Sequence, residues 1–444
     1  MNLKFFCYLL LITLICKKSY SQEIVKIGLL EETIYPFELN SPNLFFDFFK
    51  SKSNLNEIKI IGMGEATHGT KEFFNIKKET FKFLALHYNY RIFGIEASFG
   101  GCSYINDYVS SGTGNIDSVI LNFDFWTWRT EEVKDLILWI KDFNLDKSQN
   151  EKIIFYGFDM QNIYSPIQYL NTFFNHTKIE NSKKLHEIIK PITQLSELDV
   201  YKKLKNKILH YSDTLFQIHD LINDWLQNNK AEIQSIHSER QFRLLQFCSD
   251  NYYQAIKNLS AGYYYRDSCM AVNITKIQQQ EDAKMFIWAH NGHINLSNLD
   301  KISGSKPMGA YLKSNYREKY YSIGFVFSKG NFQAVKGPNS VFGGLFKYIF
   351  ARKKLYKGLI ECSVPNSKRN TLTNNFKLIE HTAFLIDLIN TNNTVFTTSK
   401  QAYDIGAVFI NYKRSVGQII AKEQFNSLIY LRNTTRATPL KRKK

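Results

Sequence analysis

Short apolar segments recur along the chain, and most of them end at a glycine or at a polar residue. Their hydrophobic residues follow one another without the alternation that marks a strand with one solvent-exposed face. Continuous apolar runs of this length are typical of strands buried on both faces, as in parallel sheets covered by helices. We therefore predict strands at residues 58–64, 90–97, 152–159, 284–291, 321–328, 382–388 and 404–410.

Helical patterns lie between the predicted strands. Apolar residues recur at helical spacing over residues 71–87 and again over residues 129–143. An alternation of buried strands and helices indicates an α/β fold. We expect a mostly parallel central sheet that is flanked by helices.

One long stretch has a different pattern. No glycine or proline occurs between Pro191 and Gly262, and the apolar residues of 200–225 recur at spacings of three and four. That spacing predicts one long amphipathic helix, and a second helix is predicted over residues 234–259. A stripe of this kind normally packs against a partner helix, so we interpret it as core. The fold is thus expected to carry a helical insertion at about residues 164–265.

The N-terminus has the pattern of a secretory signal. Lys4 precedes an apolar run over residues 5–15, and Ser19-Tyr20-Ser21 resembles a small-x-small cleavage site. We expect a signal peptide over residues 1–22, cleaved after Ser21 or Gln22, and one α/β domain over residues 23–440. The run is too short for a comfortable membrane span, although an uncleaved anchor is the alternative. The mature protein would be exported, to the periplasm or the medium, without a stable membrane span.

Composition adds constraints on partners and cofactors. The chain has 444 residues and a net charge of +17, part of which lies at the two ends, including the C-terminal "LKRKK". The other basic residues are spread as single lysines, and we find no basic cluster interleaved with aromatics. This distribution is typical of a solvated surface, and no nucleic-acid partner is expected. The cysteines after the predicted signal are far apart and form no CxxC pair, which disfavours a cysteine-based zinc site. Their disulfide pairing stays open.

Candidate chemistry lies where the apolar strands end. Ligands of open α/β sheets bind outside the carboxyl ends of the strands, so polar side chains from neighbouring strands would meet there. Carboxylates and imidazoles at one edge form a general acid–base constellation. The side chains in these positions are Glu65 and His68 at the end of the first strand, Glu96 at the end of the second, Asp159 at the end of the third, and His290 and His293 at the end of the fourth.

The usual hydrolase signatures are missing from the chain. It contains no G-x-S-x-G, no H-E-x-x-H and no P-loop motif. An imidazole can take a proton from water near neutral pH, and a neighbouring carboxylate can fix its tautomer. The same histidines and carboxylates are also suitable ligand types for zinc, manganese or iron. The residues alone leave both possibilities open.

Several segments resemble the erythromycin esterase family, in the family's order, over about residues 57–332. They are "GEATHGTKEFFNIKKETFKFL", "FGIEAS", "FDFWTWRTEEVKDLILWIKDFN", "YGFDMQ", "YRDSCMAVNI", "WAHNGHI" and "KPMGAYLKSNYREKYYSIGF". The family's best understood members add water to a macrolide lactone and so open the ring, as in antibiotic resistance. The resemblance implies an α/β core with helical additions and a hydrolase acting on an ester or lactone of a small-molecule substrate.

The resemblance also implies roles for individual residues. His68 corresponds to the general base, Glu65 and Glu96 to its acidic partners, and His290 and His293 to the remaining histidines of the site. Lys77 falls where the known esterases can have arginine, so contact with an oxyanion or substrate could differ, because lysine lacks the guanidinium fork. A further departure is the predicted export, since resistance esterases act inside the cell.

Three functions follow from this interpretation. The first is an ester hydrolase that needs no cofactor, and the second is a metal-dependent hydrolase on the same histidines. The third is a non-catalytic binding protein in which Trp126, Trp128 and Trp288 line a ligand pocket. A fold by itself does not decide among them.

Overall fold

The computed structural model describes residues 34–39, 41, 45–194, 197–261, 264–297, 306–337, 359–367 and 371–440. The predicted signal peptide lies outside the described residues. Within these residues, no helix combines the length and apolar character that a membrane crossing requires. Cys102, Cys248, Cys269 and Cys362 are all buried and unpaired.

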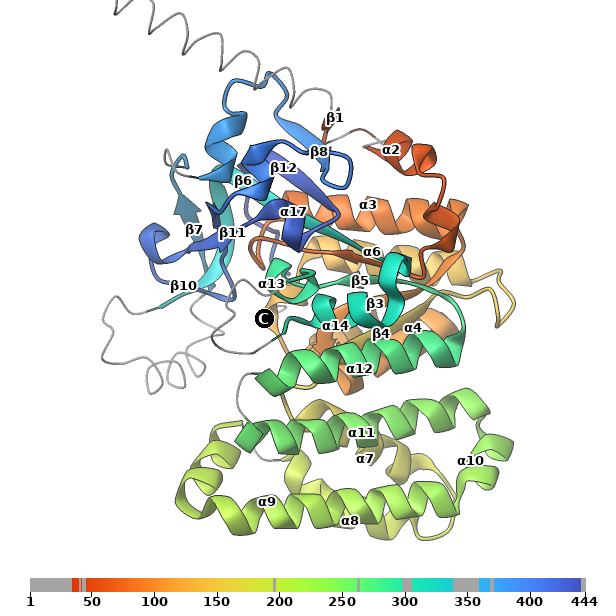
Figure 1. The fold of residues 1–444 in the computed structure, drawn as a ribbon. Helices are drawn as coiled ribbons and strands as arrows, with labels where there is room; N and C mark the ends of the chain where they lie inside the picture. The colour runs from red at the N-terminus through yellow and green to blue at the C-terminus, as the bar shows by residue number, and fades with distance from the viewer. Residues whose placement is uncertain are drawn as a thin grey trace, which may run out of the picture.

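A ten-stranded sheet forms the centre of the described chain (Figure 1). From one edge to the other its main path runs β1 (Ile34–Pro36), β8 (Ala383–Asp387), β12 (Ser427–Thr434), β6 (Tyr320–Lys336), β2 (Ile60–Met63), β5 (Lys284–Trp288), β3 (Tyr90–Ser98) and β4 (Ile154–Asp159). All pairings from β12 to β4 are parallel, whereas β1 and β8 run antiparallel to their neighbours. The predicted α/β fold with a mostly parallel sheet is confirmed.

The apolar strands are buried on both faces, as their unbroken hydrophobic runs predicted. Successive residues point into two different cores: Ile92 belongs to one hydrophobic cluster, and the next residue, Phe93, belongs to the other. Ile154 and Phe155 on β4 divide in the same way. These strands therefore contribute to both cores, so they need no polar alternation.

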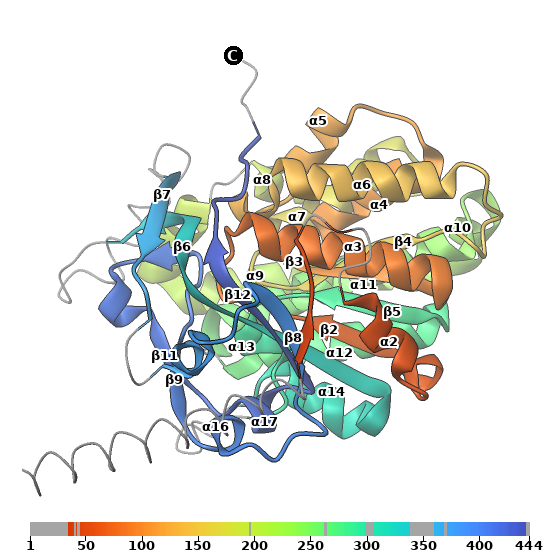
Figure 2. The same ribbon diagram turned by 90° about the horizontal axis from the view of Figure 1, so that it is seen from above.

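Helices cover both faces of the sheet. On one face lie α3 (Lys71–His87) and α6 (Glu131–Asn144), and both agree closely with the predicted helices. On the other lie α12 (Tyr264–Glu281) and α14 (Met308–Tyr316). Figure 2, seen from above, shows α3 and α6 side by side along the sheet. The sheet and its helix layers place the carboxyl ends of β2, β5 and β3 at one edge.

A separate layer of helices lies beyond α12, at the bottom of Figure 1. It consists of α7 (Tyr164–His176), α8 (Ser182–Thr193), α9 (Glu197–Asn228), α10 (Lys230–Ile236) and α11 (Glu239–Ala261). The predicted long helix is present as α9, and Leu215 on its apolar stripe is 1% exposed. The second predicted helix is divided, because Ser238 Oγ accepts a hydrogen bond from the Gln241 amide and so begins α11.

The C-terminal third departs most from prediction. A strand was predicted at 404–410, but only Val408–Phe409 form one. This short strand, β10, pairs with the C-terminal end of β6. The preceding residues turn away from the sheet, and the Ile405 amide donates to the Ala66 carbonyl. β9 (Lys400–Tyr403) and β11 (Val416–Ile419) form a small sheet of their own, and β7 (Leu359–Val364) pairs with β6. The central strand β12 was not predicted.

Candidate active site

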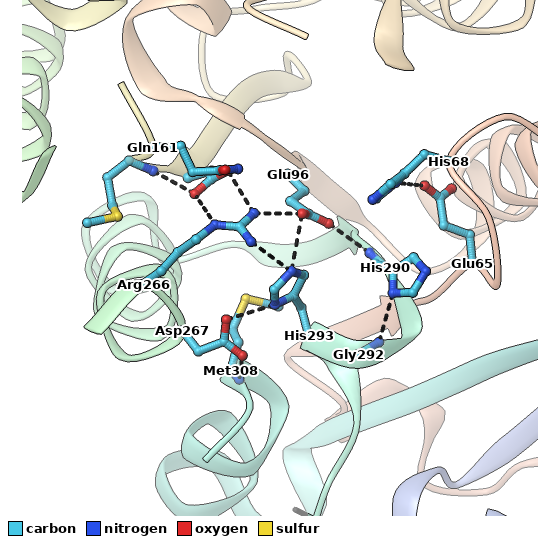
Figure 3. Close-up of polar contacts among 12 residues, drawn as sticks. Glu65, His68, Glu96, Gln161, Arg266, Asp267, His290, Gly292, His293 and Met308 are labelled. Atoms are coloured by element: carbon cyan, nitrogen blue, oxygen red, sulfur yellow. Dashed lines mark hydrogen bonds and ion pairs between the residues drawn. The ribbon is translucent and has the colours of Figure 1, made fainter. Parts of the chain in front are cut away.

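Three adjacent parallel strands bring the predicted residues together. β2, β5 and β3 are neighbours in the sheet, so their carboxyl ends share one edge. Figure 3 shows Glu65 and His68 beside His290, with Glu96 and His293 grouped around Arg266. The five residues so assembled are Glu65, His68, Glu96, His290 and His293.

The loop after β2 holds its acid and base in direct contact. His68 Nδ1 lies 2.7 Å from Glu65 Oε1, and Trp288 Nε1 donates to Glu65 Oε2 at 2.8 Å. Glu65 has no exposed surface. Burial alone would raise the pKa of Glu65, but the charge of Lys77 and the contact with His68 outweigh it and lower that pKa. Glu65 is therefore a carboxylate, and His68 Nδ1 must carry the hydrogen that the carboxylate accepts.

This contact determines the state of the other His68 nitrogen. In a neutral ring with hydrogen on Nδ1, Nε2 keeps an unshared electron pair. Among the described residues, His68 Nε2 has no hydrogen-bond partner, and the side chain is 12% exposed. Its ring lies 4.9 Å from that of His290, between centroids. A base with this geometry is ready to accept a proton from a molecule that enters the site.

Backbone contacts from distant segments hold the His68 loop in place. The Gly69 carbonyl accepts hydrogen bonds from the amides of Gln333 and Ala437, both at 2.9 Å. A Cβ atom at Gly69 would lie 2.1 Å from the Gln333 carbonyl oxygen, so only glycine allows this approach. The His68 loop is thus supported by β6 and by the segment after β12.

Lys77 lies elsewhere than the resemblance implied. Its side chain has no exposed surface, its Nζ is paired with Glu65 Oε2, and that Nζ lies 4.2 Å from the Trp288 ring. Burial lowers the pKa of Lys77 to about 8, although Glu65 opposes the change. The expectation that Lys77 contacts an oxyanion or substrate is therefore wrong for this structure, because Glu65 and Trp288 enclose the ammonium group. Lys77 acts on the site through Glu65.

Arg266, at the start of α12, organises the other half of the site. Its Nη2 lies 2.7 Å from Glu96 Oε1 and 2.9 Å from Asp159 Oδ2, while its Nε donates to Asp159 Oδ1. Glu96 also accepts the His290 backbone amide at 2.8 Å. Burial opposes ionisation of Glu96, but His293 and Arg266 outweigh it and hold the pKa of Glu96 well below its usual value. Asp159 is buried behind this arginine and does not reach the His68 side.

His293 is enclosed by carboxylates. Its Nδ1 lies 2.7 Å from Asp267 Oδ1, and its Nε2 lies 3.3 Å from Glu96 Oε1 and 3.0 Å from Arg266 Nη1. Burial and the arginine lower the pKa of His293, but Glu96 and Asp267 outweigh them and raise it to about 10. Arg266 can only donate, so its Nη1 engages His293 Nε2 while Asp267 engages Nδ1, and His293 is not available as a base.

His290 is a neutral imidazole with its hydrogen on one identifiable nitrogen. The Gly292 amide donates to His290 Nδ1 at 3.2 Å, so Nδ1 is the acceptor and the hydrogen is on Nε2. Nε2 lies 3.3 Å from the Ile405 carbonyl and 3.5 Å from Asp404 Oδ1. Burial lowers the pKa of His290, and Asp404 opposes this change.

Some members of the site were not predicted as such. Arg266 and Asp267 stand in "YRDSCMAVNI", which carried part of the resemblance, but nothing local connects that segment to the strand ends. The expectation that Trp128 and Trp288 line a pocket is wrong, because both are fully buried. Their rings pack 5.8 Å apart, and Trp128 Nε1 donates to the Glu96 carbonyl. The two indole rings form an apolar layer next to Glu65 and Glu96.

The side chains do not converge as a metal-ligand set would. Within the part of the chain that the structure describes, no three histidine, cysteine or carboxylate side chains are placed to hold one ion. The acids are engaged by cations: Lys77 pairs with Glu65, and Arg266 pairs with Glu96.

Comparison with known proteins places this geometry in a family. The model of the family described as erythromycin esterase matches residues 86–434, most of the chain. The chain belongs to the erythromycin esterase family. It is 24% identical over 369 residues to the erythromycin esterase type II of Escherichia coli, an alignment that covers 75% of this chain and 85% of that protein. Membership supports an esterase-type hydrolase.

Solved structures share the fold of this family member. An erythromycin esterase mutant in its open conformation matches with a TM-score of 0.64 and 15% identity, over 92% of this chain and all (100%) of that one. A succinoglycan biosynthesis protein matches with a TM-score of 0.74 and 18% identity, over 95% of this chain and 99% of that one. At such identities the likeness concerns the fold, so the reaction has to be argued from the site.

Proposed function

We propose that this erythromycin esterase family member hydrolyses an ester or lactone by direct attack of water, with His68 as the general base. The observation that carries the proposal is the state of His68. A buried carboxylate fixes its Nδ1 hydrogen, and its Nε2 is left without a partner among the described residues. Family membership supports the same class of reaction.

The proposed step conserves atoms and protons. His68 Nε2 takes a proton as the water oxygen attacks the carbonyl carbon, which gives a tetrahedral oxyanion. When that intermediate collapses, its bond to the leaving oxygen breaks, and His68 returns the proton to the alkoxide. The products are a carboxylic acid and an alcohol, which are joined in one molecule when the substrate is a lactone. Glu65 stabilises the imidazolium between the two transfers.

The oxyanion needs a hydrogen-bond donor, and the histidines differ in their ability to supply one. His293 Nδ1 faces Asp267 and its Nε2 faces Arg266 and Glu96, so both nitrogens of His293 are already engaged. His290 Nε2–H has only long contacts, 3.3 Å or more, with Ile405 and Asp404. His290 also faces His68, so we assign it as the donor for the oxyanion.

The test is a panel of alkyl esters, aryl esters and lactones of several ring sizes, macrolides among them. Purified wild-type protein should hydrolyse at least one member, and His68→Ala should reduce its kcat by about 10²–10⁴-fold. The control is His87→Ala, which changes an exposed histidine at the far end of α3. Both variants should keep the wild-type melting temperature, since neither imidazole fills a core.

Other outcomes would favour the other functions. One equivalent of metal in the wild-type protein, lost together with activity in His68→Ala, would support the metal-dependent hydrolase. A co-purifying small molecule, with no turnover on the whole panel, would support a binding protein. Equal rates for wild type and His68→Ala on a verified substrate would refute the proposed base.

A further inference from the structure

The segment that follows β9 lies against the site, although it belongs to a different sheet. The Asp404 amide donates to the Ser415 carbonyl at 3.0 Å, which ties the segment to the small β9–β11 sheet. The next amide, that of Ile405, donates to the Ala66 carbonyl at 2.8 Å, between Glu65 and His68. Thr67 and Ile405 also form an isolated parallel bridge. These contacts join the small sheet directly to the His68 loop.

This attachment places Asp404 beside His290. Asp404 Oδ1 lies 3.5 Å from His290 Nε2, and the Ile405 carbonyl oxygen lies 3.3 Å from the same nitrogen. The Asp404 side chain is 51% exposed, whereas the His290 side chain is 11% exposed. On its other side the carboxylate meets Gly417, where an added Cβ would lie 3.3 Å from Asp404 Oδ2. Because Gly417 has no side chain, there is room beside it for the Asp404 carboxylate.

Asp404 differs from the other acids that face His290. The titratable groups that act on this ring are Asp404, the His68 and Glu65 of the loop after β2, and Glu96 of β3. Glu65 is paired with Lys77 and Glu96 with Arg266, so cations largely balance their charges. Among the described residues, Asp404 has no lysine or arginine partner. Its charge is therefore directed to His290 alone.

We propose that Asp404 is a positioning residue for His290: with the Ile405 carbonyl it keeps the hydrogen on Nε2, and its charge favours a proton on the ring. This inference rests on the proposed function, in which His290 donates to the oxyanion. Asp404 touches no reacting atom in that scheme. It acts by setting the tautomer and the charge of the His290 imidazole, which is the group that contacts the oxyanion. Through Asp404, the β9–β11 sheet becomes part of the active site.

The coupling can be measured without any substrate. Asp404→Asn keeps the size of the side chain and removes its charge, and Glu380→Gln removes an exposed charge before β8 as the matched control. The NMR titration of His290, assigned by comparison with His290→Asn, should move to lower pH by roughly 0.2–0.7 pH units in Asp404→Asn, the range of half-exposed ion pairs. Glu380→Gln should leave the titration unchanged.

Turnover gives a second readout. His68 and His290 face each other, with ring centroids 4.9 Å apart, so a change in the charge on His290 should be visible in turnover. Removing the Asp404 charge should move the acid limb of the kcat/KM profile to lower pH. An unmoved His290 titration in Asp404→Asn would overturn the inference, even if activity fell, since the residue would then be structural. A shifted titration in a protein that hydrolyses no ester would uphold the contact and refute only the proposed function.

Discussion

Replacing Lys77 with methionine removes the cation that balances Glu65. Neither side chain of this pair has exposed surface, so water cannot stabilise the carboxylate that remains. Breaking a buried pair by removing one partner costs about 3–5 kcal/mol of unfolding free energy. Glu65 would keep its hydrogen bonds from Trp288 at 2.8 Å and from His68 at 2.7 Å. Methionine would also retain the packing against the indole, so we expect a loss near 3 kcal/mol, the lower end of that range.

A double-mutant cycle isolates the charge pair from the packing. Urea unfolding at pH 7 would be measured for wild type, Lys77→Met, Glu65→Gln and the double variant. Because the double variant has no buried charge at this position, its destabilisation should be smaller than the sum of the two single losses by about 2 kcal/mol or more. Additive losses, within about 0.5 kcal/mol, would refute the buried pair and with it the argument that Lys77 acts through Glu65.

The same substitution should alter catalysis in a recognisable direction. Without Lys77, the charge of Glu65 is balanced most easily by a proton on His68, its other close partner. The acid limb of the kcat/KM profile should therefore move to higher pH in Lys77→Met, and the loss of rate should be partly recovered at alkaline pH. A loss of kcat/KM with no movement of the limb would instead place Lys77 in direct contact with the substrate, as the family resemblance had implied.

Three further predictions concern stability and processing. The pKa of His293 is raised from 6.5 to about 10, so the folded protein keeps a proton that the unfolded chain loses, and the unfolding free energy should fall between these pH values. The fall should be roughly 2–5 kcal/mol, measured by urea unfolding at a series of pH values, and a His293→Gln variant should lack it. An equal pH dependence of the unfolding free energy in the two proteins would contradict the raised pKa of His293. Leu215→Asp should lower the stability by about 3 kcal/mol or more in thermal melts. Leu221→Asp, at a position 49% exposed on the same helix, should change the stability little, and equal losses in the two variants would contradict the packing of α9. Protein from the native host should begin at Gln22 or Glu23 by N-terminal sequencing, and an intact Met1 in the cytosol would contradict the export that we propose.

Local patterns predicted the parallel half of the fold well. The strands that became β2, β3, β4 and β5 are short apolar runs whose alternate residues enter two cores, and such runs are recognisable one at a time. The C-terminal third was harder for a physical reason. The run at 404–410 is as apolar as the others, but the Ile405 amide bonds to the Ala66 carbonyl in place of a neighbouring strand. This hydrogen bond depends on a loop more than 300 residues away in the sequence, so no local stretch of sequence can indicate it.

The residues of the site also fall into those that local sequence predicts and those that it does not. Glu65, His68, Glu96, His290 and His293 could be predicted because each follows a recognisable strand, and parallel strands share an edge. Arg266 and Asp267 lie at the start of a helix, and Asp404 directly follows β9, so their sequence surroundings indicate only where those elements start or end. Their importance comes from the charges that they meet across the sheet. Long-range electrostatic partners of this kind are visible only once the fold has brought them within hydrogen-bonding distance.

These partners decide which group can do chemistry. A strand edge with several acids and histidines offers several candidate bases, and sequence alone cannot rank them. In the folded protein, Lys77 pairs with Glu65 and Arg266 with Glu96, while His293 is enclosed by Glu96, Asp267 and Arg266. His290 has both ring nitrogens in contact with its surroundings. Of the site histidines in the described residues, His68 has the one basic nitrogen without a partner, Nε2, and for this reason we propose it as the general base.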